Sequence, residues 1–311
     1  MSPRTQRQLR TGLAFVSPWL IGFGLLVLYP FAATLYWTFC RYDLLSSPEF
    51  IGPDHFERMA REIADASGFG EALWNTFYFA IVSVPASVVL GVMLAVILNR
   101  PTRGRGIYRT LVFLPSIVPT VAAAIVWMWL LDPTKGLVNR MLQPLGVTPG
   151  WFNSPSEFFN LMSLLSGQAG PGAKDGLILM SLWGIGNFVI IYLAALGGIR
   201  KDLYEAAMLD GAGPLSRFRH VTLPALSPVI FFNLIMGLIA SVQYFTQAYV
   251  VSGGSGGPQG TTTVLSLYIF LWSFKYAEAG YASACAWAVF VVVAVATVLL
   301  FRGSKSWVHY R

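Results

Sequence analysis

The chain has 311 residues, of which 55% are hydrophobic and 11% are charged, whereas soluble domains carry about 25% charged residues. This composition excludes an ordinary soluble protein, because there is too little charge to solvate the surface of so long a chain. The net charge of +7 at pH 7 leaves two explanations, a polyanionic partner such as nucleic acid or an uneven distribution of charge across a membrane.

Six segments lack any Asp, Glu, Lys or Arg and are long enough to cross about 30 Å of hydrocarbon as helices. They are residues 13–39, 74–99, 110–131, 176–199, 226–251 and 279–301. The first follows three arginines, as a signal peptide would, but it far exceeds an apolar region of about 7 to 15 residues and should remain as an anchor. A seventh apolar run, residues 264–274, is too short to cross and is expected to be a re-entrant or interfacial helix.

The basic residues are distributed unevenly among the segments that connect the spans. With the N-terminus in the cytosol, the inside segments hold fourteen of the 21 basic residues and only three acids. Four of the arginines lie in one short loop, residues 100–109. The positive-inside rule therefore places both termini in the cytosol. The same asymmetry explains the net charge without a nucleic-acid partner.

These features predict an all-α, polytopic membrane helix bundle with six transmembrane helices, embedded in the lipid bilayer. Residues 1–12 are expected to form a cytoplasmic tail, residues 13–301 the membrane domain, and residues 302–311 a second cytoplasmic tail. Within the membrane domain, residues 200–225 form the longest cytoplasmic loop.

That loop carries signals for short helices. Asp202 and Glu205 have the spacing of a capping box, in which the first carboxylate accepts amide hydrogens and the second reaches back to the helix start. A helix should therefore begin at Asp202, and Gly211 can end it in the left-handed conformation. Pro214 suits the first turn of a second short helix. The loop is predicted to be a compact helix-turn-helix.

The sequence lacks the motifs with which a membrane protein would supply its own energy or carry out catalysis. No span carries a charged residue for ion coupling, and none of the five lysines follows a glycine as a phosphate-binding loop requires. The metalloprotease motif H-E-x-x-H is also absent. Cys40 and Cys285 lie far apart without companion ligands. We therefore expect no catalytic residue, no metal site and no cofactor within this chain.

A longer pattern in the same loop is more specific. In chain order it consists of Glu205, Ala206, Ala207, Gly211, Val221, Leu223 and Pro224. This series resembles the EAA signature of the permease subunits of ABC importers. The family usually has Ile where Val221 stands, which is a mild departure.

Shorter matches in the same order along the chain resemble the same family. They lie at residues 17–20, 75–76, 109–115, 256–258 and 261–263. Together they are similar to the carbohydrate-uptake permeases of the maltose, trehalose and glycerol-phosphate type. The similarity is greatest to the first of the two non-identical permease subunits that these importers contain.

The resemblance implies an inner-membrane permease that moves a sugar or oligosaccharide and is not itself an enzyme. It implies four partners: a second permease subunit, two ATPase subunits that bind ATP and Mg²⁺, and an extracytoplasmic sugar-binding protein. Residues 201–215 would be the coupling helix that fits a groove of the ATPase. Glu205 would orient it, Ala206 and Ala207 would allow close approach, and Gly211 would permit the turn. The expected coupling site also includes Leu209, Pro214, Leu223 and Pro224.

The fifth span contains polar residues at helical spacing. Asn233, Met236, Ala240, Gln243 and Gln247 follow one another at steps of three or four and would share one helical face. Tyr244 lies beside them. Because amides in hydrocarbon are costly unless paired, Asn233, Gln243, Tyr244 and Gln247 are candidates for a substrate pathway. Hydrogen bonds to a neighbouring helix are an equally good explanation.

Other classes of membrane protein remain as alternatives. A stand-alone channel or facilitator would also have uncharged spans, but it would not need the protruding loop. An importer for glycerol phosphate or another small solute would share the loop. A membrane-embedded enzyme would require a polar catalytic cluster, and the sequence offers none.

Overall fold

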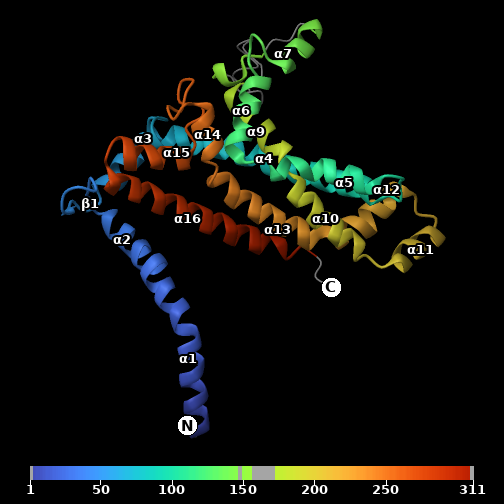
Figure 1. Ribbon diagram of the computed structural model, residues 1–311, viewed down its shortest axis with the longest axis horizontal. Helices are drawn as coiled ribbons and strands as arrows, with labels where there is room; N and C mark the ends of the chain where they lie inside the picture. The colour runs from blue at the N-terminus through green and yellow to red at the C-terminus, as the bar shows by residue number, and fades with distance from the viewer. Residues whose placement is uncertain (1–2, 146–148, 156–171, 309–311) are drawn as a thin grey trace. The chain divides into compact units, whose positions relative to one another are not determined.

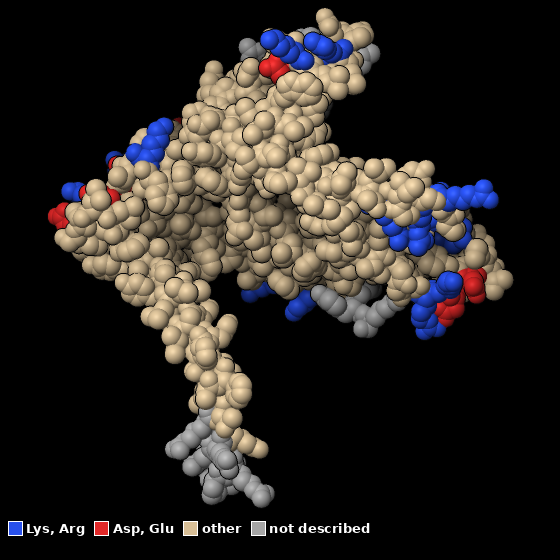
Figure 2. Space-filling view, in the orientation of Figure 1, with Lys and Arg blue, Asp and Glu red and all other residues tan. Residues whose placement is uncertain are grey.

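The computed structural model describes residues 3–145, 149–155 and 172–308, and over these residues it is mostly helical (Figure 1). The chain divides into two compact units, each considered by itself. Unit 1 comprises Met1–Ala64 and Ile269–Phe290, and unit 2 comprises Asp65–Tyr268 and Val291–Arg311. In the space-filling view, charged side chains gather in a few groups and large areas carry none (Figure 2), as a membrane protein requires.

Unit 1 contains two long helical segments, a small hairpin and an amphipathic helix. Its elements are α1 (Pro3–Phe23), a wide turn (Gly24–Leu28), α2 (Tyr29–Trp37), β1 (Cys40–Arg41), β2 (Glu49–Phe50), α3 (Asp54–Ala64), a second wide turn (Leu271–Lys275) and the start of α16 (Ala279–Ser304). The strands β1 and β2 pair antiparallel, with Cys40 opposite Phe50. Helix α3 has two acids in its first turn and a basic residue in its last, which complements the helix dipole.

Unit 2 holds the remaining described helices, except that the last two residues of the helix Leu265–Phe270 belong to unit 1. They are α4 (Phe69–Asn99), α5 (Arg105–Phe113), a 3₁₀ turn (Leu114–Ile117), α6 (Thr120–Leu130), α7 (Leu137–Leu142), two further 3₁₀ turns (Gln143–Leu145 and Trp151–Asn153), α9 (Ala173–Trp183), α10 (Gly186–Gly197), α11 (Lys201–Leu209), α12 (Pro214–Arg217), a wide turn (Phe218–Thr222), α13 (Leu223–Val242), α14 (Thr246–Val251), α15 (Leu265–Phe270) and the rest of α16.

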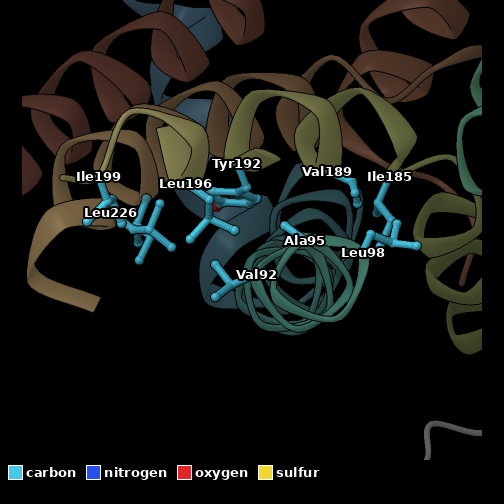
Figure 3. Close-up of a cluster of buried hydrophobic side chains, with 10 residues drawn as sticks. Val92, Ala95, Leu98, Ile185, Val189, Tyr192, Leu196, Ile199 and Leu226 are labelled. Carbon is cyan, nitrogen blue, oxygen red and sulfur yellow. The ribbon is translucent and has the colours of Figure 1, made fainter. Parts of the chain in front are cut away.

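The core of unit 2 is the packing of α4, α10 and α13 (Figure 3). From α10 and its ends come five buried side chains at steps of four and three residues, which places them on one helical face: Ile185, Val189, Tyr192, Leu196 and Ile199. They pack against Val92, Ala95 and Leu98 of α4 and Leu226 and Ile230 of α13. Because lipid is as apolar as these side chains, close van der Waals packing rather than the hydrophobic effect holds the three helices together.

Within the described residues, four helical segments are long and apolar enough to span a membrane, and two bent pairs bring the number to as many as six. The four are Thr11–Trp37, Phe69–Asn99, Pro214–Val251 and Ala279–Ser304. They coincide with the first, second, fifth and sixth predicted spans. The short apolar helix Leu265–Lys275 confirms that residues 264–274 are helical and too short to cross.

The prediction of an unbroken helix over residues 110–131 is wrong. Arg105–Ile117 and Thr120–Leu130 meet at a bend of 99°. The cause is local: Pro119 has no amide hydrogen to continue a helix, and it holds Val118 in an extended conformation (ψ 130°). The span predicted at 176–199 is also bent, by 43°, between α9 and α10.

Candidate functional site

The loop of residues 200–225 contains helix α11, but the helix starts differently from the prediction. Arg200 is extended (ψ 133°) and the helix begins at Lys201, so Asp202 lies in the first turn rather than at the cap. Within the described residues no side chain caps this end, so the predicted Asp202–Glu205 capping box is wrong. Instead, Asp202 forms an ion pair with Arg200 and accepts a hydrogen bond from the Leu203 amide (3.0 Å). The Arg200 hydrogen bond lowers the pKa of the Asp202 carboxyl.

Gly211 ends α11 as predicted. Its φ is +78°, in the left-handed region that glycine adopts without strain. The Gly211 amide donates to the Met208 carbonyl (3.0 Å), and the Ala212 amide donates to the Ala207 carbonyl (2.9 Å). These bonds satisfy carbonyl groups that the helix end would otherwise leave unpaired.

The predicted second short helix is not a separate element. Pro214 does begin α12, but the chain continues through the wide turn Phe218–Thr222 into α13. In that turn the Leu223 amide donates to the Phe218 carbonyl, five residues back. Since Pro224 has no amide hydrogen, it cannot supply the regular bond at this point, and the wide turn accommodates the gap. Leu223 and Pro224 therefore open the long α13 helix.

Most of the α11 surface is exposed and partly apolar. Leu209 is 89% exposed, and Leu203, Met208 and Leu215 are exposed as well. Glu205 and Ala206 also face outward. Ala207 and Tyr204 are half-buried, and the Tyr204 hydroxyl is hydrogen-bonded to the Thr222 hydroxyl (2.9 Å). This bond ties α11 to the base of α13, and the loop presents a stiff surface.

A cavity of about 280 Å³ lies among the membrane helices of unit 2. Its lining contains hydroxyl, amide and aromatic side chains, and none of the described residues that line it is charged. The polar lining includes Ser83, Ser87, Ser181, Asn187, Ser241 and Gln247. Phe79 and Tyr244 contribute aromatic rings, whose centroids are 4.3 Å apart.

The cavity hydroxyls are held by backbone hydrogen bonds. Ser87, Ser181 and Ser241 each donate to the carbonyl three residues earlier, at 2.8, 2.7 and 2.7 Å. Their lone pairs remain able to accept hydrogen bonds from a solute. The Tyr244 hydroxyl donates to the Leu177 carbonyl (3.3 Å), which fixes the ring against the cavity wall. The site can therefore contact a neutral, hydroxyl-rich solute.

Most of this chain matches one known protein family. The family described as binding-protein-dependent transport system inner membrane component matches residues 87–305. The probable ABC transporter permease protein YesP of Bacillus subtilis (strain 168) is 39% identical over 302 residues, which cover 96% of this chain and 92% of YesP. The chain belongs to this family. It is an ABC transporter permease of the inner membrane.

Further relatives agree with this assignment. The trehalose/maltose transport system permease protein MalF of Thermococcus litoralis is 32% identical to this permease, covering 95% of this chain and 94% of MalF. A crystal structure of a bacterial alginate ABC transporter, in complex with an alginate pentasaccharide-bound periplasmic protein, matches with a TM-score of 0.79 at 24% identity. That match covers 97% of this chain and 96% of the other. At that identity the match shows a shared fold.

The permease structure separates the four residues that the sequence analysis named as candidates for the substrate pathway. Tyr244 and Gln247 line the cavity, whereas Asn233 and Gln243 do not. The reason is that α13 ends at Val242, and α14 begins only at Thr246. The expectation of one continuous helical face is therefore wrong, and Gln243 is exposed outside the cavity.

Asn233 lies inside the packing of the permease helices, where it is 1% exposed. Its amide faces the Tyr192 hydroxyl of α10, and neither group completes a hydrogen bond within the described part of the chain. Its position outside the cavity speaks against Asn233 as a pathway residue, whereas a hydrogen bond from Asn233 to a neighbouring helix stays a prediction.

The sequence did not lead us to the serines of the cavity or to the hydrogen bond between Tyr204 and Thr222 that holds α11 in place. Ser83 and Ser87 lie four residues apart in α4, and hydroxyl side chains at this spacing in an apolar span were a usable signal. Tyr204 is the only aromatic residue of α11. Its partner Thr222 is eighteen residues away, and nothing local connects the two.

Proposed function

We propose that this permease is the first-type membrane subunit of an ABC importer for a sugar or oligosaccharide. The observation that carries the proposal is the uncharged, hydroxyl-lined cavity in a chain whose relatives include a trehalose/maltose permease and a lactose permease. Each bent pair is taken as one span, which gives six spans with both termini in the cytosol. The concentration of basic side chains near α5, α11 and α12 (Figure 2) supports this orientation.

The chemistry of the cavity favours a neutral substrate. Serine oxygens and the Gln247 amide can exchange hydrogen bonds with sugar hydroxyls, while the rings of Phe79 and Tyr244 offer apolar surface to the carbon face of a sugar ring. A phosphate or carboxylate in this cavity would need a cation, and the described residues of its lining include no Lys or Arg. An importer of sn-glycerol 3-phosphate, as one relative is named, would have to obtain that cation from a second permease subunit.

The exposed α11 helix supports coupling to a separate ATPase. The chain has no phosphate-binding loop of its own. The mechanical work of ATP hydrolysis must therefore reach the membrane helices from a separate ATPase, through a stiff surface of this chain. Leu209 and its exposed apolar neighbours provide that surface. The complete importer would contain a second permease, two ATPase subunits holding ATP and Mg²⁺, and a sugar-binding protein. A stand-alone channel would have no use for the α11 surface.

The coupling role is tested by Gly211→Val in the assembled importer. A β-branched residue at φ +78° costs about 1 to 2 kcal/mol or more and distorts the end of α11. Gly213→Val is the matched control, because φ there is −69° and no atom lies within 4 Å of the place that a Cβ would occupy. In proteoliposomes, Gly211→Val should reduce sugar uptake per ATP hydrolysed, whereas Gly213→Val should not. Normal uptake by an assembled Gly211→Val complex would refute the coupling role.

The proposal that the substrate binds in the cavity is tested by substituting two glutamines. Gln247→Leu removes a hydrogen-bonding group from the cavity, and Gln243→Leu removes the same group from an exposed position outside it. Loss of one hydrogen bond of about 1 to 1.5 kcal/mol should raise the half-saturating sugar concentration about five- to tenfold for Gln247→Leu only. Equal effects of the two substitutions would contradict the placement of the substrate. Uptake of glycerol phosphate but no sugar would contradict the substrate class.

A further inference from the structure

A second cavity, of about 460 Å³, lies in unit 2 beside the coupling loop. It is an open pocket bounded by the end of α4, the end of α10, helix α11 and helix α12. Its lining includes Asn99, Arg100, Tyr204, Arg217 and Thr222. The cavity exists because α4 stops at Asn99, where Arg100 is extended (ψ 144°) ahead of Pro101.

The two charged residues in this lining are both arginines. Within the described residues neither Arg100 nor Arg217 forms an ion pair. The Nε atom of Arg217 is buried and has no hydrogen-bond partner there. A buried donor of this kind costs free energy unless an acceptor reaches it. The cavity therefore has unused capacity to bind an anion.

The acids of the coupling loop do not neutralise these arginines. Asp202 is engaged with Arg200, and neither Glu205 nor Asp210 lines the cavity. Further basic residues surround the site, and Figure 2 shows blue side chains gathered at the end of unit 2 where α5 and α12 lie. The local field therefore attracts negative charge.

The neutral part of the lining restricts the kind of anion. The Tyr204 and Thr222 hydroxyls, 2.9 Å apart, and the Asn99 amide can bond to oxygen atoms. The planar guanidinium groups match the geometry of phosphate oxygens. Phe218 and Leu196 add apolar surface next to these groups, which suits a phosphate that is attached to carbon.

We infer that the cavity between α4, α11 and α12 binds a phosphate group, supplied either by the headgroup of an anionic phospholipid or by a soluble phosphate. The inference goes beyond the proposed function and uses it only to assign the cavity to the cytosolic leaflet. Basic pockets between membrane helices on that side are suited to anionic headgroups. A phosphate held here would contact α11 as well as the bundle, through Tyr204 and Arg217.

The test uses the purified full chain and three probes: phosphatidylglycerol, phosphatidylcholine and inorganic phosphate. Native mass spectrometry counts the bound molecules and gives their affinities. Wild-type protein should bind phosphatidylglycerol or inorganic phosphate more tightly than phosphatidylcholine. Arg217→Gln should weaken that binding about fivefold, since each basic residue near a membrane surface contributes about that factor. Arg219→Gln is the matched control, because Arg219 is exposed and does not line the cavity.

The outcomes separate the two sources of phosphate. Tight phosphatidylglycerol binding that excess inorganic phosphate does not displace identifies a lipid, whereas Arg217-dependent binding of inorganic phosphate itself identifies a soluble ligand. The inference is overturned if neither probe exceeds phosphatidylcholine, or if Arg219→Gln weakens binding as much as Arg217→Gln. If Arg217→Gln does not fold, the same binding measurement is made with Arg100→Gln. The inference then depends on weaker binding by that variant and on the preference of the wild-type protein for phosphatidylglycerol or inorganic phosphate over phosphatidylcholine.

Discussion

Gly186 shows how one residue determines the distance between two helices. It opens α10 where α5 passes, and a Cβ at this position would lie 2.7 Å from the Val112 carbonyl oxygen and 2.9 Å from the Phe113 Cα. Both are backbone atoms, so no side-chain rotation can relieve the contact. Glycine therefore permits the close approach of α5 and α10 on which one wall of the membrane cavity depends.

Gly186→Ala should destabilise the permease by about 1 to 3 kcal/mol, because the added methyl group overpacks the α5–α10 contact. Gly197→Ala is the control in the same helix, since no atom lies within 4 Å of the place that its Cβ would occupy. Alanine favours a helix interior by about 1 kcal/mol over glycine, so Gly197→Ala should be neutral or stabilising. Thermal unfolding of the full chain in detergent measures both, and equal midpoints would contradict the close approach.

Asp43 organises the turn between β1 and β2. Its Oδ1 accepts hydrogen bonds from the Ser46 amide (2.7 Å), the Ser46 hydroxyl (2.8 Å) and the Leu45 amide (3.0 Å). The bonds from Ser46 and Leu45 lower the pKa of the carboxyl to about 2. Since the ionised form accepts these bonds, the folded turn favours the charged carboxylate.

The sign of the pH dependence follows from that lowered pKa. The stabilisation of the turn should be complete above the ordinary aspartate pKa of about 3.9 and disappear as the pH falls through about 2. Hydrogen exchange of the Ser46 amide, corrected for its intrinsic rate, should show protection at about pH 5 and loss of protection near pH 2. In Asp43→Ala the protection should be absent at both pH values. Protection that persists in this variant would exclude the Asp43 bonds as its cause.

At the scale of elements, prolines and ion pairs shape the segments between membrane spans. Pro119 turns the third predicted span into a sharp bend. In unit 1, Arg58 of α3 lies 3.0 Å from Glu62 and 2.6 Å from Glu278. Its guanidinium also lies 4.0 Å from the ring centroid of Tyr281, and the Tyr281 hydroxyl donates to Glu62 (2.6 Å). This network fastens α3 to the start of α16.

Arg58→Gln should weaken the attachment of α3 by about 1 to 2 kcal/mol, a modest value because partial exposure screens the ion pairs. Arg61→Gln is the matched control, because Arg61 is exposed on the same helix and forms no ion pair within the described residues. Limited proteolysis within α3 should be faster for Arg58→Gln and unchanged for Arg61→Gln. Equal rates for the two variants would show that the network contributes nothing measurable.

At the scale of the whole molecule, the proposed function requires a separate ATPase, because the sequence of this permease contains no phosphate-binding loop. Its predicted spans contain no charged residue that could couple transport to an ion gradient. Purified alone in liposomes, the chain should therefore accumulate no sugar against a gradient, whether or not a proton or sodium gradient is applied. Radiolabelled sugar uptake measures this. Concentrative uptake by the lone chain would contradict the dependence on a separate ATPase.

The features that the sequence determined by itself are those that depend on nearby residues. Apolar segments such as 279–301 are long enough to cross a membrane whatever surrounds them, and Gly211 ends α11 because its own backbone tolerates a positive φ. The coupling loop and the family resemblance could both be found in this way.

Tertiary structure decided the features that depend on distant residues. The spacing of Asn233 and Gln247 is helical, yet the break after Val242 places only Gln247 in the cavity. Likewise, Arg100 and Arg217 are 117 positions apart in sequence and line one cavity only because the ends of α4 and α10 meet α11 and α12 there. Such sites arise from the packing of whole helices, and local spacing carries no information about which helix ends will meet.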